Sequence, residues 1–252
     1  MKIVTWNVNG IRARGKQVEE LVGTVAPDVL CLQEIKATPE QIEEDVCYLP
    51  ELQNHWHGAK GGYSGVSVHV RRKLGKPTFS VPAPLDRETR VCVAELEGGL
   101  TVASIYAPNG GKDYAAKLAF YNDFVEWATA FAKQGKPLVI VGDLNIAHTD
   151  LDLHPSQRRE GVIGQLPEER ALFSRLLAEG DLIDTARLVH PEADRLFTWW
   201  PYWKGARQNN LGWRIDYVLI SGSLRERVKD ANVLAQFGTS DHAPFYVDLD
   251  WP

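Results

Sequence analysis

Residues 138–145 read LVIVGDLN, an apolar run that ends in polar side chains. Four apolar residues in a row, three of them β-branched, are typical of a strand buried on both faces. Asp143 and Asn145 follow at once, so a carboxylate and an amide are expected where this strand leaves the core. Because side chains alternate across a strand, both are expected to point the same way.

The N-terminus repeats this pattern. Residues 2–10 read KIVTWNVNG, in which an apolar, β-branched run leads into Asn7 and Asn9. By the same alternation these two amides are expected to share one direction. Two buried strands from distant parts of the chain, each ending in a polar, apolar, polar triplet, indicate one shared site.

Two further strands are expected to end in polar groups. Residues 29–32 are apolar and lead to Glu34. Residues 91–105 contain two apolar runs around a Gly-Gly turn, which predicts a hairpin. Its second strand runs out into Tyr106 and Asn109, so a phenol and an amide are expected at a fourth edge.

Periodicity and capping signals place the remaining elements. Strict alternation predicts a half-exposed strand over residues 66–70. Helical signals are found over residues 18–25, from residue 38, and over residues 113–133 and 168–179, and two more strands are expected over 213–220 and 245–249. Many strands with few helices between them favour an α/β fold of two stacked sheets with helices outside, instead of regular βαβ repetition.

Length and composition fit one soluble domain. The 252 residues contain no linker, charge block or composition shift, so we expect a single domain over residues 1–252. Hydrophobic residues make up 44% and charged residues 24%, and no apolar run approaches the roughly 20 residues of a membrane span. Met1 leads directly into the first strand without an apolar signal region, and we expect a cytoplasmic protein without a membrane partner.

The cysteines support the same compartment. Cys31, Cys47 and Cys92 are odd in number and lack the spacing of a metal site. A disulfide framework and a zinc site are therefore not expected, and the three thiols should be reduced.

The charge balance leaves two interpretations open. A net charge of −5 speaks against a nucleic-acid partner, because phosphate binding is driven by Lys and Arg. Basic residues nevertheless gather locally, at residues 12–16, at 71–73, at 158–159, and at Lys204, Arg207 and Arg214. A solvated surface would explain each group, and a phosphate-binding surface would explain why several of them follow strand ends.

The polar groups at the strand ends suit one kind of chemistry. Among them are Glu34, Asp143, Asp216 and Asp241, and no thiolate. Such a set of oxygen ligands suits Mg²⁺, with Mn²⁺ as a substitute, and points to phosphate esters. Hydrolysis of a phosphodiester needs a metal to neutralise charge, a base to deprotonate water and donors for the phosphate oxygens.

Simpler explanations hold for several residues. A polar residue at a strand end is more often a turn former or a helix cap, and we keep that interpretation for Asn9, Ser104 and Asp248. The aromatic run over residues 199–203 would ordinarily belong to the core. Asp241 and His242 differ, because two titratable groups stand together between Gly-Thr-Ser and Pro, in a turn that favours exposure of both.

Four segments closely resemble motifs of the exonuclease III / class II AP endonuclease family, part of the larger endonuclease–exonuclease–phosphatase group. They read DVLCLQEIK (28–36), GDLN (142–145), NLGWRIDYVLIS (210–221) and SDH (240–242). The resemblance covers essentially the whole chain in the expected order and implies a four-layered α/β sandwich. One motif departs from the family, because Ala186 stands where an aromatic residue is usual.

The resemblance also implies roles at the reaction centre. Glu34 would bind the metal, with Asn7 and Asp241 close by. Asp143 would orient or deprotonate the attacking water, helped by Asn145. His242, held by Asp216, would contact the scissile phosphate. Tyr106 and Asn109 would be further donors to it.

A second set of positions would contact DNA. Trp199, Trp203 and Trp213 match positions that line the pocket for a flipped-out abasic sugar or the adjacent DNA groove. Gly164 would leave room for an entering sugar, although a plain turn glycine explains it equally well. Arg158 and Lys112 are the basic residues expected at this surface.

The function implied is that of a Mg²⁺-dependent DNA repair nuclease. It would hydrolyse the phosphodiester 5′ to an abasic site in double-stranded DNA and trim 3′ ends, and we expect it to act as a monomer. Two alternatives remain open at this point. One is a phosphatase or phosphodiesterase for a lipid or inositol phosphate, and the other is a DNA-binding protein with an inactive site.

Overall fold

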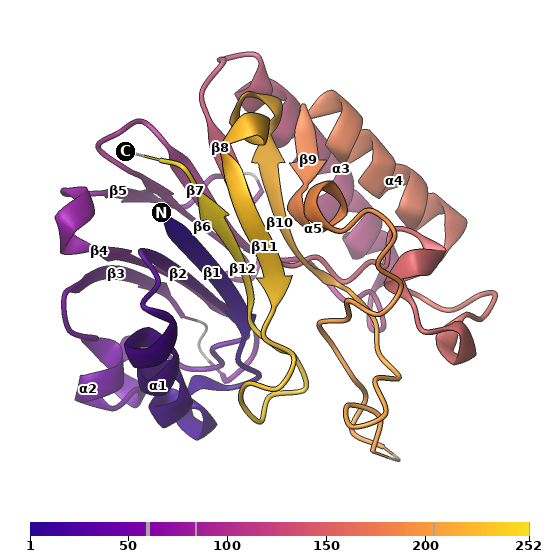
Figure 1. Cartoon of the computed structure of the whole chain (residues 1–252), viewed down its shortest axis with the longest axis horizontal. Helices are drawn as coiled ribbons and strands as arrows, with labels where there is room; N and C mark the ends of the chain where they lie inside the picture. Colours follow the sequence, from indigo (N-terminus) through magenta and orange to yellow (C-terminus); the bar gives the residue numbers. More distant parts are fainter. Residues whose placement is uncertain (59–60, 84, 204, 252) are drawn as a thin grey trace.

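The computed structural model describes residues 1–58, 61–83, 85–203 and 205–251. Two six-stranded sheets of mixed strand direction stack against each other, and helices cover their outer faces (Figure 1). The α/β fold with four layers that the sequence predicts is confirmed.

The first sheet has the strand order β11-β12-β1-β2-β4-β3. β1 and β2 are parallel, and the other neighbours are antiparallel. The strands are β1 (Lys2–Asn7), β2 (Val29–Gln33), β3 (Leu52–His57), β4 (Val66–Arg71), β11 (Val228–Val233) and β12 (Phe245–Leu249).

The second sheet has the order β5-β6-β7-β8-β10-β9. β7 and β8 are parallel, and β10 runs antiparallel to β8. The predicted hairpin is confirmed as β6 and β7. The strands are β5 (Thr78–Ser80), β6 (Val91–Glu95), β7 (Thr101–Tyr106), β8 (Leu138–Asp143), β9 (Leu182–Asp184) and β10 (Asp216–Ser221).

The helices form the two outer layers. α1 (Gly15–Val25) and α2 (Glu44–Cys47) lie on the side of the first sheet, and α3 (Tyr114–Ala132) and α4 (Pro167–Glu179) lie on the side of the second (Figure 1). α5 (Thr185–Val189) follows β9 directly. Short 3₁₀ turns complete the structure: η1 (Ile11–Ala13), η2 (Pro39–Gln41), η3 (Arg72–Leu74), η4 (Asp150–Asp152), η5 (Pro155–Gln157) and η6 (Gly222–Arg227).

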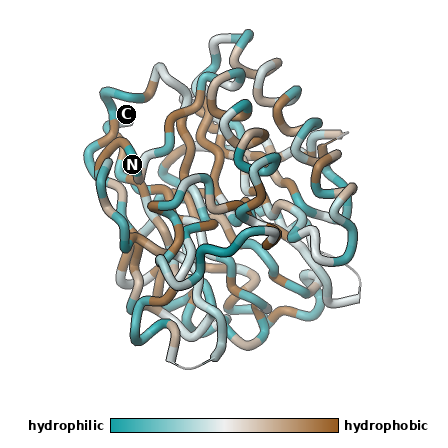
Figure 2. The backbone as a smooth tube through the Cα atoms, turned by 90° about the vertical axis from the view of Figure 1, so that its right-hand side faces the viewer, coloured by the Kyte–Doolittle hydropathy of each residue, from teal (hydrophilic) through white to brown (hydrophobic). Residues whose placement is uncertain are grey.

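The core is divided into layers by the sheets. One apolar cluster lies between the two sheets and includes Val29 of β2 and Val139 of β8. A second joins the second sheet to α3 and α4, and a third joins the first sheet to α1 and α2. Figure 2 shows the same arrangement, with hydrophobic segments along the strands and hydrophilic segments at the periphery.

Two local predictions were wrong. The strand over residues 66–70 is buried on both faces and not half-exposed. Val66, Val68 and Val70 face the apolar cluster between the sheets, and Ser67 and His69 are also fully buried on the other face. Its polar residues Ser67 and His69 bond to each other, and the His69 ring lies edge-on to Trp56. The helix signal at Thr38 yields only the 3₁₀ turn η2.

The topology collects strand ends at one end of the sandwich. β1, β2, β7 and β8 all end there, at Asn7, Gln33, Tyr106 and Asp143. β10 begins at this same end with Asp216, because it runs antiparallel to β8. β12 likewise begins there, immediately after residues 241–244, since it runs antiparallel to β1.

The basic groups are scattered by the fold. Residues 71–73 lie at the opposite end of the first sheet, because Val70 pairs with the first residue of β2. Arg214 is fully buried against Asp152 and Asp184. Neither can contribute to a phosphate-binding surface near the strand ends, which corrects the expectation from clustering alone. Lys204 lies outside the described residues.

Two further expectations concern the cysteines and membranes. Cys31, Cys47 and Cys92 are buried and unpaired, as predicted. None of the helices in the described part of the chain combines the length and apolar character needed to cross a bilayer.

Candidate active site

A cavity of about 470 Å³ opens at this end of the sandwich. It lies where the ends of the two sheets meet, and both sheets contribute to its wall. The residues that line it are Glu34, Tyr106, Asn109, Asp143, Asn145, Val162, Ile163, Gly164, Trp199, Trp213, Ile215, Asp241 and His242. The structure thus brings together seven predicted catalytic or metal residues and three predicted pocket residues from seven separate segments of the chain. Asn7 and Asp216 are bonded to this group through Asp143 and His242.

Asn7 joins the two carboxylates at the centre. Its Nδ2 donates to Glu34 Oε1 at 3.0 Å and to Asp143 Oδ2 at 2.9 Å. Its Oδ1 accepts the backbone N–H of Asn9 at 3.0 Å, which fixes this orientation of the amide. Asn7 therefore positions both carboxylates, and it would have to turn its amide over to offer oxygen to a metal.

Glu34 is held in its ionised form. Burial would raise the pKa of its carboxyl, but hydrogen bonds from Asn7 and Lys36 outweigh burial and lower that pKa. Lys36 Nζ lies 2.7 Å from Glu34 Oε2 and donates to Asn9 Oδ1 at 2.6 Å. Lys36 is a site residue that was not predicted, although it stands two residues after Glu34 in the motif DVLCLQEIK (28–36).

Asp143 has the opposite electrostatic balance. Burial raises the pKa of its carboxyl to about 8, and the carboxylates of Asp216 and Glu34 act in the same direction against the opposing effect of His242. Its Oδ1 accepts the backbone N–H of Asn145 at 3.0 Å. A carboxylate with this pKa can take up a proton near neutral pH, as a general base must.

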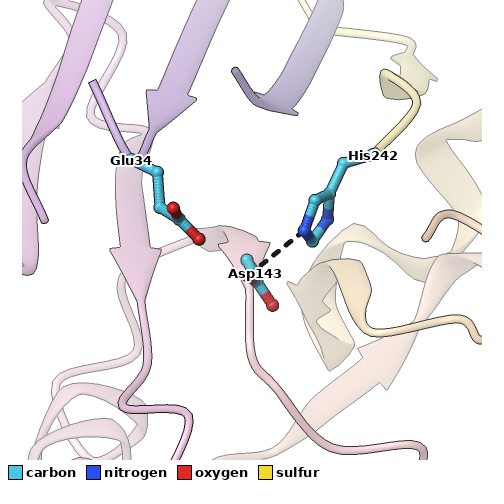
Figure 3. Close-up of side chains that lie close together, drawn as sticks. All are labelled: Glu34, Asp143 and His242. Carbon is cyan, nitrogen blue, oxygen red and sulfur yellow. Dashed lines mark ion pairs between the residues drawn. The ribbon is translucent and has the colours of Figure 1, made fainter. Parts of the chain in front are cut away.

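His242 bridges two carboxylates, as Figure 3 shows in part. Its Nδ1 lies 2.8 Å from Asp216 Oδ2, and its Nε2 lies 3.9 Å from Asp143 Oδ2. Burial would lower the pKa of the imidazole, but Asp216 and Asp143 raise it to about 10. The ring is therefore a cation at neutral pH and can donate to a phosphate oxygen.

The turn that carries His242 is anchored to β1. Ser240 Oγ donates to the backbone oxygen of Asn7 at 2.8 Å, and Trp6 Nε1 donates to that of His242 at 3.1 Å. The turn therefore faces the cavity. Its exposure was overestimated, since only 4% of His242 is accessible.

Donor groups line the other wall. Asn145 Nδ2 donates to the backbone oxygen of Ala107 at 2.9 Å, and Asn109 Nδ2 lies 3.3 Å from Asn145 Oδ1. Burial, together with Glu34 and Asp143, raises the pKa of Tyr106, so its phenol stays protonated. Arg90 lies over the Tyr106 ring, 4.9 Å from its centroid.

Asn9 belongs to this site, contrary to its interpretation as a turn former. Its Nδ2 donates to Asp241 Oδ1 at 2.9 Å. Asp241 Oδ2 also accepts Trp199 Nε1 at 3.0 Å. Burial would raise the pKa of Asp241, and His242, Asn9 and Trp199 together lower it. The sequence signal was a polar residue two positions after Asn7, but Asn9 has a φ of 45°, so strand alternation does not set the direction of its side chain.

Two indole rings and a glycine form the apolar part of the wall. Trp199 and Trp213 meet edge to face, with ring centroids 5.8 Å apart and an interplanar angle of 86°. Gly164 has a φ of +94°, and a Cβ there would lie 2.9 Å from Trp213 Cζ3. This glycine is therefore required by both its backbone conformation and its close approach to the indole.

Three predicted DNA contacts lie outside the cavity. Trp203 is 43% exposed. Arg158 is exposed in a neighbouring hollow and donates to the backbone oxygen of Asp150 at 2.9 Å. Lys112 is exposed, with its Nζ 5.2 Å from the centroid of the Tyr63 ring.

The central donor set fits a divalent cation. Ligand atoms of Glu34, Asp143 and His242 all lie within 4.8 Å of one another (Figure 3). Burial is the main cause of the raised pKa of Asp143, and the neighbouring carboxylates of Asp216 and Glu34 add to it. A bound cation would favour the ionised form of such a carboxylate. A protonated imidazole does not coordinate, so Glu34 and Asp143 are the candidate ligands, and carboxylate oxygens suit a hard ion.

Comparison with known proteins places this geometry among nucleases. The Endonuclease/Exonuclease/phosphatase family matches residues 4–242. An exodeoxyribonuclease from Bacillus subtilis is 34% identical over 255 residues, which cover 97% of each chain.

Solved structures show the same similarity. A 3′ phosphatase from Neisseria bound to a product DNA hairpin has a TM-score of 0.88 and 32% identity, with 100% of both chains covered. An AP endonuclease from Archaeoglobus fulgidus has a TM-score of 0.89 and 27% identity, again with 100% of both chains covered.

Proposed function

This chain belongs to the Endonuclease/Exonuclease/phosphatase family, and on that premise we propose how its site works as that of a DNA repair nuclease. The substrate is double-stranded DNA, in which the enzyme hydrolyses the phosphodiester 5′ to an abasic site and trims 3′ ends. The observation that carries this proposal is the placement of two carboxylates and a cationic imidazole at one end of a cavity walled by Trp199 and Trp213.

Glu34 would hold a divalent metal ion, with Asp241 close by and with Asn7 fixing the carboxylates of Glu34 and Asp143. We propose Mg²⁺, for which Mn²⁺ can substitute, because the donors are oxygen atoms. When bound, the ion supplies neutralisation of the phosphate charge.

Asp143 orients the attacking water and accepts its proton. Its carboxylate is almost fully buried, and the backbone N–H of Asn145 and the Nδ2 of Asn7 fix its direction. Asn145 helps to hold the water in this arrangement. A base and a water whose positions are already fixed reduce the entropic cost of bringing the water to the phosphorus.

His242 holds the phosphate as it gains charge. Asp216 fixes the ring through Nδ1, so that Nε2 is directed toward the cavity and Asp143. The phenol of Tyr106 and the amide of Asn109 are further donors at this wall. Donors fixed before the reaction stabilise charge that develops in the transition state.

The apolar wall selects the substrate. Flipping a nucleotide out of the duplex is cheapest where no base has to be unstacked. Trp199 and Trp213 offer flat surfaces to a deoxyribose. Gly164 lines the same cavity, and its lack of a Cβ lets the Trp213 ring lie against it. Arg158, Lys112 and Trp203 would contact the flanking DNA from outside the cavity.

We also propose that the chain works as one catalytic domain and as a monomer in the cytoplasm. The three unpaired thiols support a reducing compartment.

One experiment tests the proposal against its two alternatives. The protein is incubated with a duplex carrying a single abasic analogue, with an intact duplex and with an inositol polyphosphate, each in Mg²⁺ and in EDTA. We expect Mg²⁺-dependent cleavage 5′ to the abasic analogue. Release of phosphate from the inositol compound alone would identify a phosphatase for that class, and DNA binding without cleavage would identify an inactive site.

A further inference from the structure

Behind the cavity wall, Lys117 of α3 and Glu169 of α4 form a fully buried ion pair. Lys117 Nζ lies 2.6 Å from Glu169 Oε1, and both side chains have 0% exposure. Removing two charges from water is costly, and their mutual attraction alone often fails to compensate. The further bonds that each group makes therefore indicate what the pair does.

Glu169 holds the segment that contains Gly164. Its Oε2 accepts the backbone N–H of Gly164 at 2.6 Å and that of Leu166 at 2.9 Å. The Gly164 oxygen in turn accepts the N–H of Ala147 at 2.7 Å. Both backbone polar groups of Gly164 are thus fixed, and with them its distance from the Trp213 ring.

Lys117 holds the two amide-bearing loops. Its Nζ donates to the backbone oxygen of Asn145 at 2.8 Å and to that of Asn109 at 3.2 Å. The ammonium thus lies between these two oxygens and the carboxylate of Glu169. Gly110 makes room for the side chain, since a Cβ there would lie 2.8 Å from Lys117 Cδ.

We propose that this ion pair is a positioning device with divided roles, an inference that rests on the proposed function. Glu169 sets the wall that admits the abasic sugar and so determines substrate selectivity. Lys117 sets the amides of Asn109 and Asn145, which serve the phosphate and the water in both reactions. The pair connects the two roles, because it ties three loops to the packed helices α3 and α4.

Two single substitutions separate the roles. In Glu169→Gln, one amide oxygen replaces two carboxylate oxygens, so Gly164, Leu166 and Lys117 compete for a single acceptor. We expect kcat/KM for abasic-site cleavage to fall about tenfold further than that for 3′-end trimming, since small displacements of a positioned group are costly. Lys117→Met removes the ammonium that donates to the backbone oxygens of Asn109 and Asn145. We expect kcat/KM to fall for both activities, by factors that differ by no more than about threefold.

Leu176→Ala is the matched control. Leu176 is buried on the same helix as Glu169 but faces the apolar cluster. This variant should lower the melting temperature and leave the ratio of the two activities unchanged. A ratio that shifts as far in Leu176→Ala as in Glu169→Gln, or equal losses of both activities in Glu169→Gln, would overturn the proposal.

A double variant tests the inference if a single variant fails to fold, and hydrogen exchange tests it if the proposed function is wrong. Lys117→Met/Glu169→Gln leaves no unpaired buried charge, and it should lose both activities with abasic-site cleavage falling about tenfold further. Hydrogen exchange needs no activity: Glu169→Gln should speed exchange of the Gly164 and Leu166 amides and leave that of α3 unchanged. If the Gly164 and Leu166 amides exchanged as slowly in Glu169→Gln as in the wild type, the inference would be rejected. An inactive wild type would reject only the proposed function.

Discussion

Asp143 and Asp216 are register partners: the last residue of β8 lies opposite the first residue of β10. Residues directly opposite one another in an antiparallel pair project from the same face, so the two carboxylates lie side by side. His242 lies against both of them, at 2.8 Å from Asp216 and 3.9 Å from Asp143. One pair of strands thus creates the electrostatic environment in which the imidazole stays protonated and Asp143 takes up a proton readily.

Glu34→Gln tests the metal site. The substitution preserves the shape of the side chain and removes its charge, so we expect weaker Mg²⁺ binding by at least about tenfold with the fold retained. Isothermal titration calorimetry measures the affinity, and circular dichroism checks the fold. Glu20→Gln, on the exposed side of α1, is the control. Equal titration curves for Glu34→Gln and the wild type would exclude Glu34 as a ligand.

Asp143→Asn tests the water-activating role. We expect kcat to fall by at least about 10²-fold while DNA affinity is largely kept, because the candidate base is lost and the contacts to the substrate remain. A variant that no longer bound DNA would instead show that Asp143 serves binding.

The pH profile belongs to the same test. The pKa of Asp143 is raised to about 8, and the base acts when deprotonated, so activity should rise with pH up to that value. A bound cation favours the ionised carboxylate and shifts this rise to lower pH. The pKa of His242 is raised to about 10, so activity should fall again above that pH. Asp143→Asn should remove the acid limb.

Asp216 and His242 are expected to act as a unit. Asp216 fixes the orientation of the ring and stabilises its positive charge, so Asp216→Asn or His242→Gln alone should cost nearly as much kcat as both together. His57, which lies 2.8 Å from Asp86 outside the cavity, provides a control pair, and His57→Gln should leave kcat unchanged. Fully additive losses in the double variant would contradict the pairing.

Gly164→His tests the abasic-sugar pocket. A bulky residue beside Trp213 should lower abasic-site cleavage and largely spare 3′-end trimming, where the terminal nucleotide approaches differently. The φ of +94° adds strain to any substitution here, so a control must carry strain without obstruction. Gly161→His meets this need, because Gly161 also has a positive φ but has open space around it.

Trp213→Ala completes that test. It should weaken discrimination between abasic and intact duplex more than it weakens DNA affinity, since phosphate contacts dominate affinity. If Gly164→His and Trp213→Ala each reduced both activities in equal proportion, the sugar pocket would have to lie elsewhere.

Asp152→Asn tests the buried charges beneath Trp213. Burial opposes ionisation, but Arg214 and Arg187 lower the pKa of Asp152 to about 2. A lowered folded-state pKa contributes stability that is present above about pH 4 and is lost as the pH falls toward 2, and this shift corresponds to roughly 2 kcal/mol. Urea unfolding should therefore show a deficit for the variant at pH 7 that narrows below pH 4. Asp250→Asn, at an exposed pair with Lys229, should have little effect on stability at either pH, because solvent screens the pair. A deficit for Asp152→Asn that is independent of pH would contradict the linkage.

Local sequence determined the strands and where their polar ends fall. The apolar runs before Asn7, Glu34, Tyr106 and Asp143 specify buried strands, because only burial accounts for such uninterrupted β-branched stretches. The composition of their ends, oxygen ligands without thiolates, was enough to indicate a hard cation and a phosphate ester. The specific roles required the family resemblance.

Alternation stops being a guide where the strands stop. Asn9, Glu34 and Asn145 have φ values of 45°, 48° and 52°, so the backbone leaves the extended conformation at these residues. Their side-chain directions depend on that turn and not on a period of two. For the same reason the sequence did not identify Asn9 and Lys36 as parts of the site.

Contacts between segments were decided only by the tertiary structure. The sequence could not show that Arg214 would be buried while Arg158 stays exposed, or that Lys117 and Glu169 would meet behind the cavity. Nor could it show that Asp143 would face Asp216, which depends on the register of two antiparallel strands 73 positions apart. The physical reason is that such contacts depend on how sheets and helices pack, and packing is a property of surfaces brought together from the whole chain, whereas sequence periodicity reports only whether one segment has an apolar face to bury.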